Sequence, residues 1–164
     1  GKSIGYVIIL IGLIGLAFSI WKIRTLAQKR TELDSDESII QEMIAKTKNN
    51  TSYESKENIL DELILNYSAN VEKGVSWIKF FAAVAPLLGL LGTVIGMIET
   101  FQAITLFGTG DPKQMAGGIS QALVTTMLGL IVAAPLLGFY TFISDKVSSL
   151  IQVVEEKASY ILSK

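Results

Sequence analysis

Residues 116–143 read AGGISQALVTTMLGLIVAAPLLGFYTFI, a run of 28 residues without a charged side chain. An uncharged and mostly apolar run of this length is typical of a helix that crosses a membrane, which needs about 20 residues. The run also carries side chains that form hydrogen bonds without titrating, namely Ser120, Gln121, Thr125 and Thr126. This pattern predicts a helix that faces other protein or water as well as lipid.

The composition of the whole chain agrees with a membrane protein. Half of the 164 residues are hydrophobic and only 18% are charged, and the mean hydropathy is +0.48. The net charge of −1 gives no basic field that would attract nucleic acid. The chain contains neither cysteine nor histidine, which removes thiol chemistry and the commonest transition-metal ligands. We therefore expect no metal, no cofactor, no nucleic-acid partner and no enzymatic activity.

Two more apolar segments, 4–20 and 80–98, complete a pattern of three membrane spans. At a rise of about 1.5 Å per residue, each segment crosses a hydrocarbon core of about 30 Å, the first only marginally. Most basic residues flank one end of these spans, namely Lys22, Arg24, Lys29, Arg30, Lys73, Lys79 and Lys146, against Lys2 and Lys113 at the other end. The positive-inside rule then predicts an N-terminus outside and a C-terminus in the cytoplasm.

The segment 31–73 between the first two spans is polar, with apolar residues at helical spacing. We interpret it as two amphipathic helices with a break near 49–52. A similar stripe predicts that the third helix continues to Leu162. The predicted fold class is an all-α membrane protein with three transmembrane helices and long cytoplasmic helical extensions. Its parts are a first transmembrane helix (1–23), cytoplasmic amphipathic helices (24–74), a second transmembrane helix (75–107), a periplasmic loop (108–115), and a third transmembrane helix with its cytoplasmic extension (116–164).

The second and third spans each combine small residues with one proline, whereas the first span is built from Ile, Leu, Val and Phe with three glycines, Gly5, Gly12 and Gly15. The glycines and prolines of the other two spans are Gly89, Gly92, Gly96 and Pro86 in the second span, and Gly118, Gly129 and Pro135 in the third. Glycines let helix backbones approach closely, and each proline introduces a local break in the helix. We interpret the second and third spans as the inner helices of an assembly, with the first span outside. The alternative is that glycine is common in membrane helices generally.

Threonines stand at the centre of the same two spans. Counted at about 1.5 Å per residue from the outer helix ends, Thr93 and Thr126 lie about 20 and 16 Å deep. One hydroxyl from each helix can therefore meet at one level, although each can also bond to a carbonyl of its own helix. The central parts of the spans contain no titratable side chain, so a partner must supply any group that carries a proton. Glu99, at the outer end of the second span, is either an entrance charge or a solvated interface residue.

Two stretches closely resemble the MotA/TolQ/ExbB proton channel family, and the ExbB and TolQ branch fits best. They are AAVAPLLGLLGTVIGMIETFQAI at 82–104 and GTGDPKQMAGGISQALVTTMLGLIVAAPLLGFY at 108–140. The combination of APLLGLLGT, GGIS-x-AL-x-TT and LGL-x-VA-x-P is specific, and the resemblance covers about 82–147. Some ExbB-like proteins carry a periplasmic extension before the first span, and a chain that opens on Gly1 without methionine leaves room for one.

The resemblance implies a homo-oligomeric ring in the bacterial inner membrane, usually a pentamer. The ring surrounds the helices of a dimeric, single-span ExbD- or TolR-like partner that carries an aspartate inside the membrane. Proton motive force would then be delivered through a TonB-like protein to outer-membrane transport. The alternatives are a TolQ-like role in envelope maintenance, a flagellar-type stator and a non-conducting membrane scaffold. The stator is disfavoured because such chains normally have four spans and a larger cytoplasmic domain.

By motif, Thr93 and Thr126 resemble the pore-lining threonines of this family, and we group Thr125 and Gln121 with them. Several ExbB and TolQ proteins have glutamate where this chain has Gln121, which forms hydrogen bonds but cannot titrate. If that glutamate relays protons in relatives, Gln121 cannot do so here. Either the glutamate is not essential, or a water path or Glu99 substitutes for it.

Overall fold

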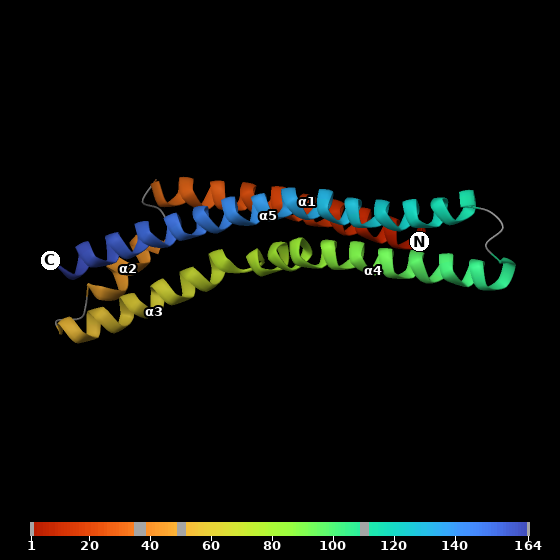
Figure 1. The fold of residues 1–164 in the computed structure, drawn as a ribbon. Helices are drawn as coiled ribbons and strands as arrows, with labels where there is room; N and C mark the ends of the chain where they lie inside the picture. Colours follow the sequence, from red (N-terminus) through yellow and green to blue (C-terminus); the bar gives the residue numbers. More distant parts are fainter. Residues whose placement is uncertain (1, 35–38, 49–51, 109–111, 164) are drawn as a thin grey trace. The chain divides into compact units, whose positions relative to one another are not determined.

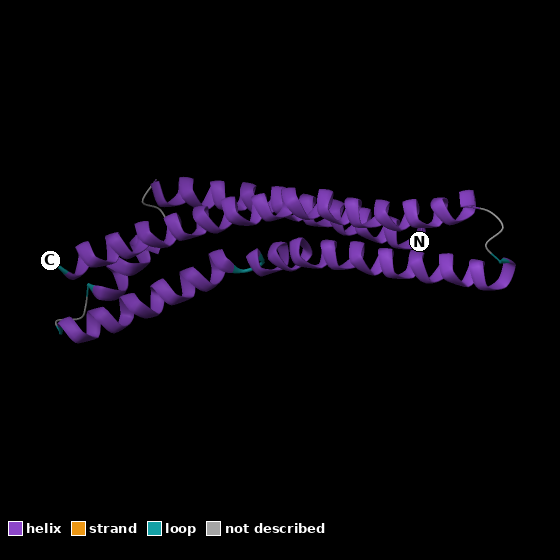
Figure 2. Ribbon diagram, in the orientation of Figure 1, coloured by secondary structure: helices purple, strands orange, loops and turns teal. Residues whose placement is uncertain are grey.

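The computed structural model describes residues 2–34, 39–48, 52–108 and 112–163. Every regular element within these ranges is an α-helix (Figures 1 and 2), which confirms the all-α fold class. The helices are α1 (Lys2–Asp34), α2 (Ile39–Thr47), α3 (Tyr53–Glu72), α4 (Val75–Phe107) and α5 (Pro112–Leu162). Three helical stretches in the described part are long and apolar enough to cross a membrane, Ser3–Leu33, Tyr53–Leu106 and Met115–Leu162. The orientation of the termini stays a prediction.

The helix ends can be compared with the segments predicted from hydropathy. α1 continues to Asp34, well beyond the apolar segment, and α5 ends at Leu162 as its apolar stripe predicts. α5 begins at Pro112, inside the segment predicted as a loop, because proline suits the first position of a helix, where no backbone N–H is needed. Residues 109–111 of that loop, and residues 49–51 at the predicted break between the amphipathic helices, lie outside the described residues.

The chain forms two compact units. The first contains Gly1–Ser19 and Trp77–Tyr140, and the second contains Ile20–Ser76 and Thr141–Lys164. In the first unit, α1 approaches α5 through glycines. A Cβ atom on Gly12 would lie 2.9 Å from Cγ1 of Val132, and one on Gly15 would lie 2.8 Å from Cδ2 of Leu136. The glycines of the first span therefore face protein, and its large apolar side chains point outward, with Leu13 63% exposed.

The second unit packs its core around apolar residues of all its helices. Met43 of α2 and Leu60 of α3 are fully buried, as the helical spacing of apolar residues in 31–73 predicts. Ile44 belongs to the same predicted stripe but is 50% exposed. From α5, Ile143 and Val154 complete this core. The amphipathic stripes therefore contribute buried side chains to the core of this unit, and Ile44 is a half-exposed exception.

A buried lysine marks the break between α3 and α4. Gly74 has φ of 88°, a left-handed conformation that favours glycine because it has no Cβ atom. Lys22 is only 4% exposed, and its Nζ atom donates a hydrogen bond of 2.6 Å to the carbonyl oxygen of Lys73. The last carbonyls of a helix lack partners within the helix. The ammonium group of Lys22 therefore supplies a donor where α3 ends.

Candidate functional site

Glycines bring the backbones of α4 and α5 together along one seam of the first unit. A Cβ atom on Gly129 would lie 2.7 Å from the carbonyl oxygen of Ala85. A Cβ atom on Gly89 would lie 3.0 Å from Cα of Thr126. Carbon atoms that are not bonded prefer separations of about 3.5–4.0 Å. Both positions therefore exclude side chains, because the obstacle in each case is backbone that cannot rotate away.

Thr93 and Thr126 meet across this seam. Their hydroxyls form a hydrogen bond in which either oxygen can be the donor, and both residues are half-buried. Thr126 Oγ1 also lies 3.1 Å from the carbonyl oxygen of Gly89, and Thr93 Oγ1 lies 3.3 Å from the same oxygen. The sequence left two arrangements open, a contact between the two hydroxyls and a bond to a backbone carbonyl. The two threonines make both kinds of contact. The depth count that put them at one level agrees with this contact.

Thr125 lies deeper in the seam than the other two threonines. It is 4% exposed, and its hydroxyl donates to the carbonyl oxygen of Ala122 at 2.6 Å. The carbonyl oxygen of Gly89 is 3.5 Å away. Gly92 packs directly against the Thr125 side chain, in the space that a Cβ atom would need. The position of Thr125 therefore suits helix packing, with its proton committed to backbone oxygens.

We call Thr93, Thr125 and Thr126 the hydroxyl cluster. All three approach the carbonyl oxygen of Gly89, a role for Gly89 beyond the packing expected from the sequence. Each hydroxyl has one proton and two acceptor lone pairs. The cluster therefore has more acceptor positions than protons, and its half-buried members can switch between donating and accepting. Threonine does not titrate, so the cluster can solvate a proton carrier but cannot store a proton itself.

Thr100 belongs to the same seam and was missed in the sequence. It is 7% exposed, and its hydroxyl donates to the carbonyl oxygen of Gly96 at 2.8 Å. Gly118 of α5 lies against that hydroxyl, and a Cβ atom on Gly96 would lie 2.8 Å from Cβ of Ala122. A signal was present, because Gly96 and Thr100 repeat the four-residue spacing of Gly89 and Thr93.

Two of the predicted site residues lie on the exposed surface of the isolated chain, outside the hydroxyl cluster. Gln121 on α5 and Glu99 on α4 are both exposed. The structure therefore brings together the threonines of the predicted site and leaves these two side chains on its surface.

The two prolines lie inside continuous helices. α4 runs through Pro86 and α5 runs through Pro135 without a change of element. Pro86 is half-buried, and Pro135 is exposed. A proline removes one hydrogen bond from the helix ladder because it has no N–H. The local breaks expected at these residues therefore do not end either helix, and both helices continue on both sides of the proline.

Comparison with known proteins places the chain in a family. A model of the MotA/TolQ/ExbB proton channel family matches residues 31–156, a stretch that contains all of α4 and the whole hydroxyl cluster. The chain belongs to this family. It is a transport family of proton channels rather than a family of enzymes. Together with the three apolar helical stretches, family membership makes the chain a multi-pass membrane protein.

Several relatives carry ExbB names. The chain is 37% identical over 99 residues to a protein of Methanothermobacter thermautotrophicus called a biopolymer transport protein ExbB homolog, covering 60% of this chain and 35% of the relative. It is 46% identical over 66 residues to the biopolymer transport protein ExbB of Aquifex aeolicus, covering 40% and 45% respectively. It is 40% identical over 63 residues to the biopolymer transport protein exbB1 of Vibrio cholerae, covering 38% and 28%. The matches thus span less than half the length of these relatives.

Proposed function

We propose that this chain is an ExbB-type proton-channel subunit of an inner-membrane motor that energises TonB-dependent outer-membrane transport. The observation that carries the proposal is the contact between the Thr93 and Thr126 hydroxyls. It lies within membrane-crossing helices whose central residues are uncharged. Such a pair can hydrogen-bond a proton carrier while providing no titrating group of its own.

The titrating carboxylate is supplied by a partner in this proposal. Family membership supports an ExbD- or TolR-like single-span dimer that inserts its aspartate into a ring of these chains, usually a pentamer. Large apolar side chains on α4 and α5 are exposed in the single chain, with Leu87 at 63% and Leu123 at 61%. In a membrane assembly, neighbouring copies, the partner helices and lipid would cover these faces.

The proposed mechanism uses both hydrogen-bonding states of the threonines. The partner's aspartate takes a proton from the periplasmic side, which removes its charge and lowers the cost of its contact with an apolar wall. Thr93 and Thr126 donate to the carboxylate, and they accept from the protonated acid. The partner helices then turn relative to the ring, and the proton leaves to the cytoplasm. The TonB-like protein receives the motion.

The same proposal includes the placement of the chain in the inner membrane. The N-terminus lies on the periplasmic side, and the second compact unit, apart from the span ends that it contains, lies in the cytoplasm. The basic residues near the inner ends of the spans, such as Lys79 and Lys146, support this orientation. Glu99 then lies at the periplasmic end of α4, where an exposed carboxylate can attract cations to the entrance.

One observation favours a second candidate, a non-conducting membrane scaffold. Every hydroxyl of the cluster approaches a backbone carbonyl, as packing threonines do. A TolQ-like role in envelope maintenance would use the same geometry with a different energised partner. Native mass spectrometry of the chain co-expressed with an ExbD-like protein tests for the partner. An unequal complex near five to two supports the motor, and a homo-oligomer that ignores the partner supports the scaffold.

Replacement of the two threonines by valine tests the function itself. Thr93→Val and Thr126→Val each keep the shape of the side chain but remove the hydrogen bond to the carrier. Such bonds to charged groups contribute about 1.5–3 kcal/mol, so we expect energised uptake to fall at least about tenfold. Thr105→Val is the matched control, because Thr105 is an exposed threonine on α4 whose hydroxyl bonds to the Phe101 carbonyl of its own helix. Unchanged uptake in both variants, with the complex intact, would overturn the proposal.

A further inference from the structure

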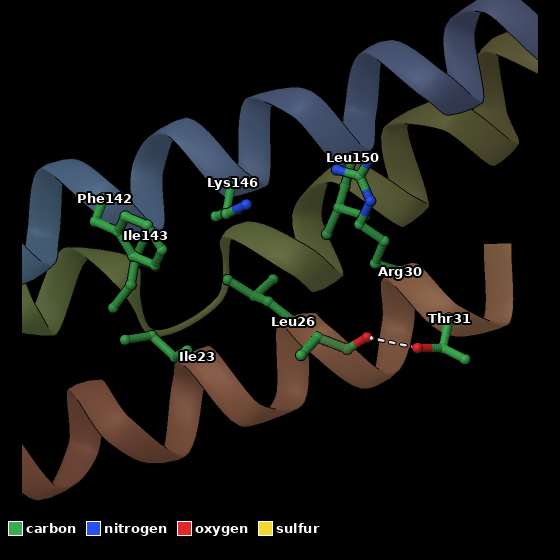
Figure 3. Close-up of a pocket in the computed structure, with 9 residues that line it drawn as sticks. Ile23, Leu26, Arg30, Thr31, Phe142, Ile143, Lys146 and Leu150 are labelled. Carbon is green, nitrogen blue, oxygen red and sulfur yellow. Dashed lines mark hydrogen bonds between the residues drawn. The ribbon is translucent and has the colours of Figure 1, made fainter. Parts of the chain in front are cut away.

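The second compact unit contains a pocket between α1 and α5 that the hydroxyl cluster does not use. Its volume is about 290 Å³, near the lower end of the range for pockets that bind small molecules. Figure 3 shows side chains from the two helices converging on it. Leu26 of α1 and Ile143 and Leu150 of α5 form a buried apolar floor, none more than 4% exposed. The pocket is therefore built largely from well-packed apolar residues.

Two basic side chains, one from each helix, line this apolar pocket. Arg30 comes from α1 and Lys146 from α5 (Figure 3), and both residues are exposed. The Arg30 guanidinium donates a long hydrogen bond of 3.5 Å to the hydroxyl of Ser149. The Lys146 Nζ atom lies 5.5 Å from the centre of the Phe142 ring. Both of these contacts are with neutral groups, so neither of them neutralises the charge of the cation.

The position of the pocket along α5 is that of a lipid headgroup layer. The uncharged run ends at Ile143, so Lys146 lies about 4.5 Å beyond it and Ser149 about 9 Å beyond it. The headgroup layer on each side of a bilayer is about 5–8 Å thick. Phe142 and Ile143 therefore line the pocket at the edge of the hydrocarbon core, Lys146 follows at headgroup depth, and Arg30, bonded to Ser149, lies at the outer boundary of the headgroup layer. A phospholipid presents its groups in the same order, with acyl chains first and then the phosphate.

We propose that this pocket binds an anionic phospholipid, with its phosphate between Arg30 and Lys146 and the start of an acyl chain against the apolar floor. A guanidinium and an ammonium group both bind phosphate through charge-assisted hydrogen bonds. A zwitterionic choline headgroup brings a cation of its own toward the same two charges, so it binds less well. The pocket is too small for a whole lipid, and the remaining acyl chain lies in the bilayer. The lipid fills the space between α1 and α5.

Native mass spectrometry of the full chain with defined lipids tests this proposal. We expect the wild type to retain phosphatidylglycerol in preference to phosphatidylcholine. A double variant, Arg30→Gln with Lys146→Gln, removes both charges. Basic residues near an anionic surface contribute about fivefold each, so the loss for the pair is about 25-fold. Lys157→Gln is the matched control, because Lys157 is exposed on the same helix and does not line the pocket.

A second variant tests the pocket without changing charge. Ala27 lines the pocket and is exposed, so Ala27→Phe fills the space without crowding the core. We expect it to release phosphatidylglycerol although both cations remain. Retention at the wild-type level in both the charge variant and Ala27→Phe would overturn the proposal. So would equal retention of the two lipids by the wild type. Displacement of the lipid by millimolar inorganic phosphate would instead assign the cations to free phosphate, which also overturns it.

Discussion

The contact of α5 with α4 differs in kind from its contact with α1, although glycines stand at both. At the α4 seam, the atoms that face Gly89 and Gly129 belong to the backbone of the opposite helix. At the α1 contact, the atoms that face Gly12 and Gly15 belong to the side chains of Val132 and Leu136. Side chains can change rotamer, but a helix backbone moves only as a whole. The seam with α4 is therefore the rigid one, and the hydroxyl cluster lies on it.

The largest effect that would test this difference is expected at Gly129. An alanine Cβ there meets the Ala85 carbonyl oxygen at 2.7 Å, so the helices must separate. Overpacking of this kind costs about 1–3 kcal/mol, and we expect Gly129→Ala to lower the thermal midpoint of unfolding in detergent and to disrupt the contact of Thr93 with Thr126. Gly138→Ala is the control on the same helix, because a Cβ at Gly138 meets nothing within 4 Å. Equal unfolding midpoints for Gly129→Ala and Gly138→Ala would show that the close backbone contact at Gly129 does not make the α4 seam rigid.

A smaller loss is expected where α1 meets α5. A Cβ at Gly15 meets the methyl groups of Leu136, which can turn aside at a cost of about 0.5–1.5 kcal/mol. We expect Gly15→Ala to destabilise the protein less than Gly129→Ala and to leave proton transport intact. The comparison requires both unfolding midpoints and flux measurements. A Gly15→Ala loss as large as that of Gly129→Ala would mean that the α1 contact is as rigid as the seam.

Within the seam, Thr100 should separate packing from function. Its buried hydroxyl bonds to the Gly96 carbonyl, and loss of such a bond costs about 0.5–1.5 kcal/mol. We expect Thr100→Val to lower the unfolding midpoint slightly and to change proton flux little, the reverse of Thr93→Val. A flux defect in Thr100→Val as severe as that in Thr93→Val would extend the functional surface along the whole seam.

The smallest effect is expected at Gly117. A Cβ atom at this residue meets nothing within 4 Å, whereas one at the neighbouring Gly118 meets the hydroxyl of Thr100. Alanine is favoured over glycine in helices by about 1 kcal/mol, so Gly117→Ala should leave the midpoint unchanged or raise it. Gly118→Ala should lower it. Matched melting curves of the two variants would show whether the α4 seam continues to this end of α5.

Much of this arrangement could be predicted from sequence patterns. Hydropathy indicated three spans, and counting residues put Thr93 and Thr126 at one level, which agrees with their hydrogen bond. Thr125 could not be separated from Thr126 in this way, because neighbouring residues on a helix differ by rotation, and only the crossing of α4 and α5 decides which one is buried. The exposure of Gln121 depends on the same crossing.

Other features depend on contacts that residue spacing does not record. Lys22 directly follows an apolar span and was assigned to a basic flank, yet it is buried against the Lys73 carbonyl. That contact joins residues 51 positions apart, so no local pattern contains it. The approach of a second helix likewise decides which glycines face backbone and which face open space. Gly118 and Gly117 are neighbours in the sequence and differ completely in their surroundings.

The most direct test of the account is proton flux into vesicles that contain this chain together with the proposed ExbD-like partner. The wild type should conduct protons when a potential is applied, and the double variant Thr93→Val with Thr126→Val should assemble with the partner but lose most of the flux. Serine at both positions restores the hydroxyls and should recover conduction. Wild-type flux in an assembled valine variant would contradict the claim that these two hydroxyls serve the proton carrier.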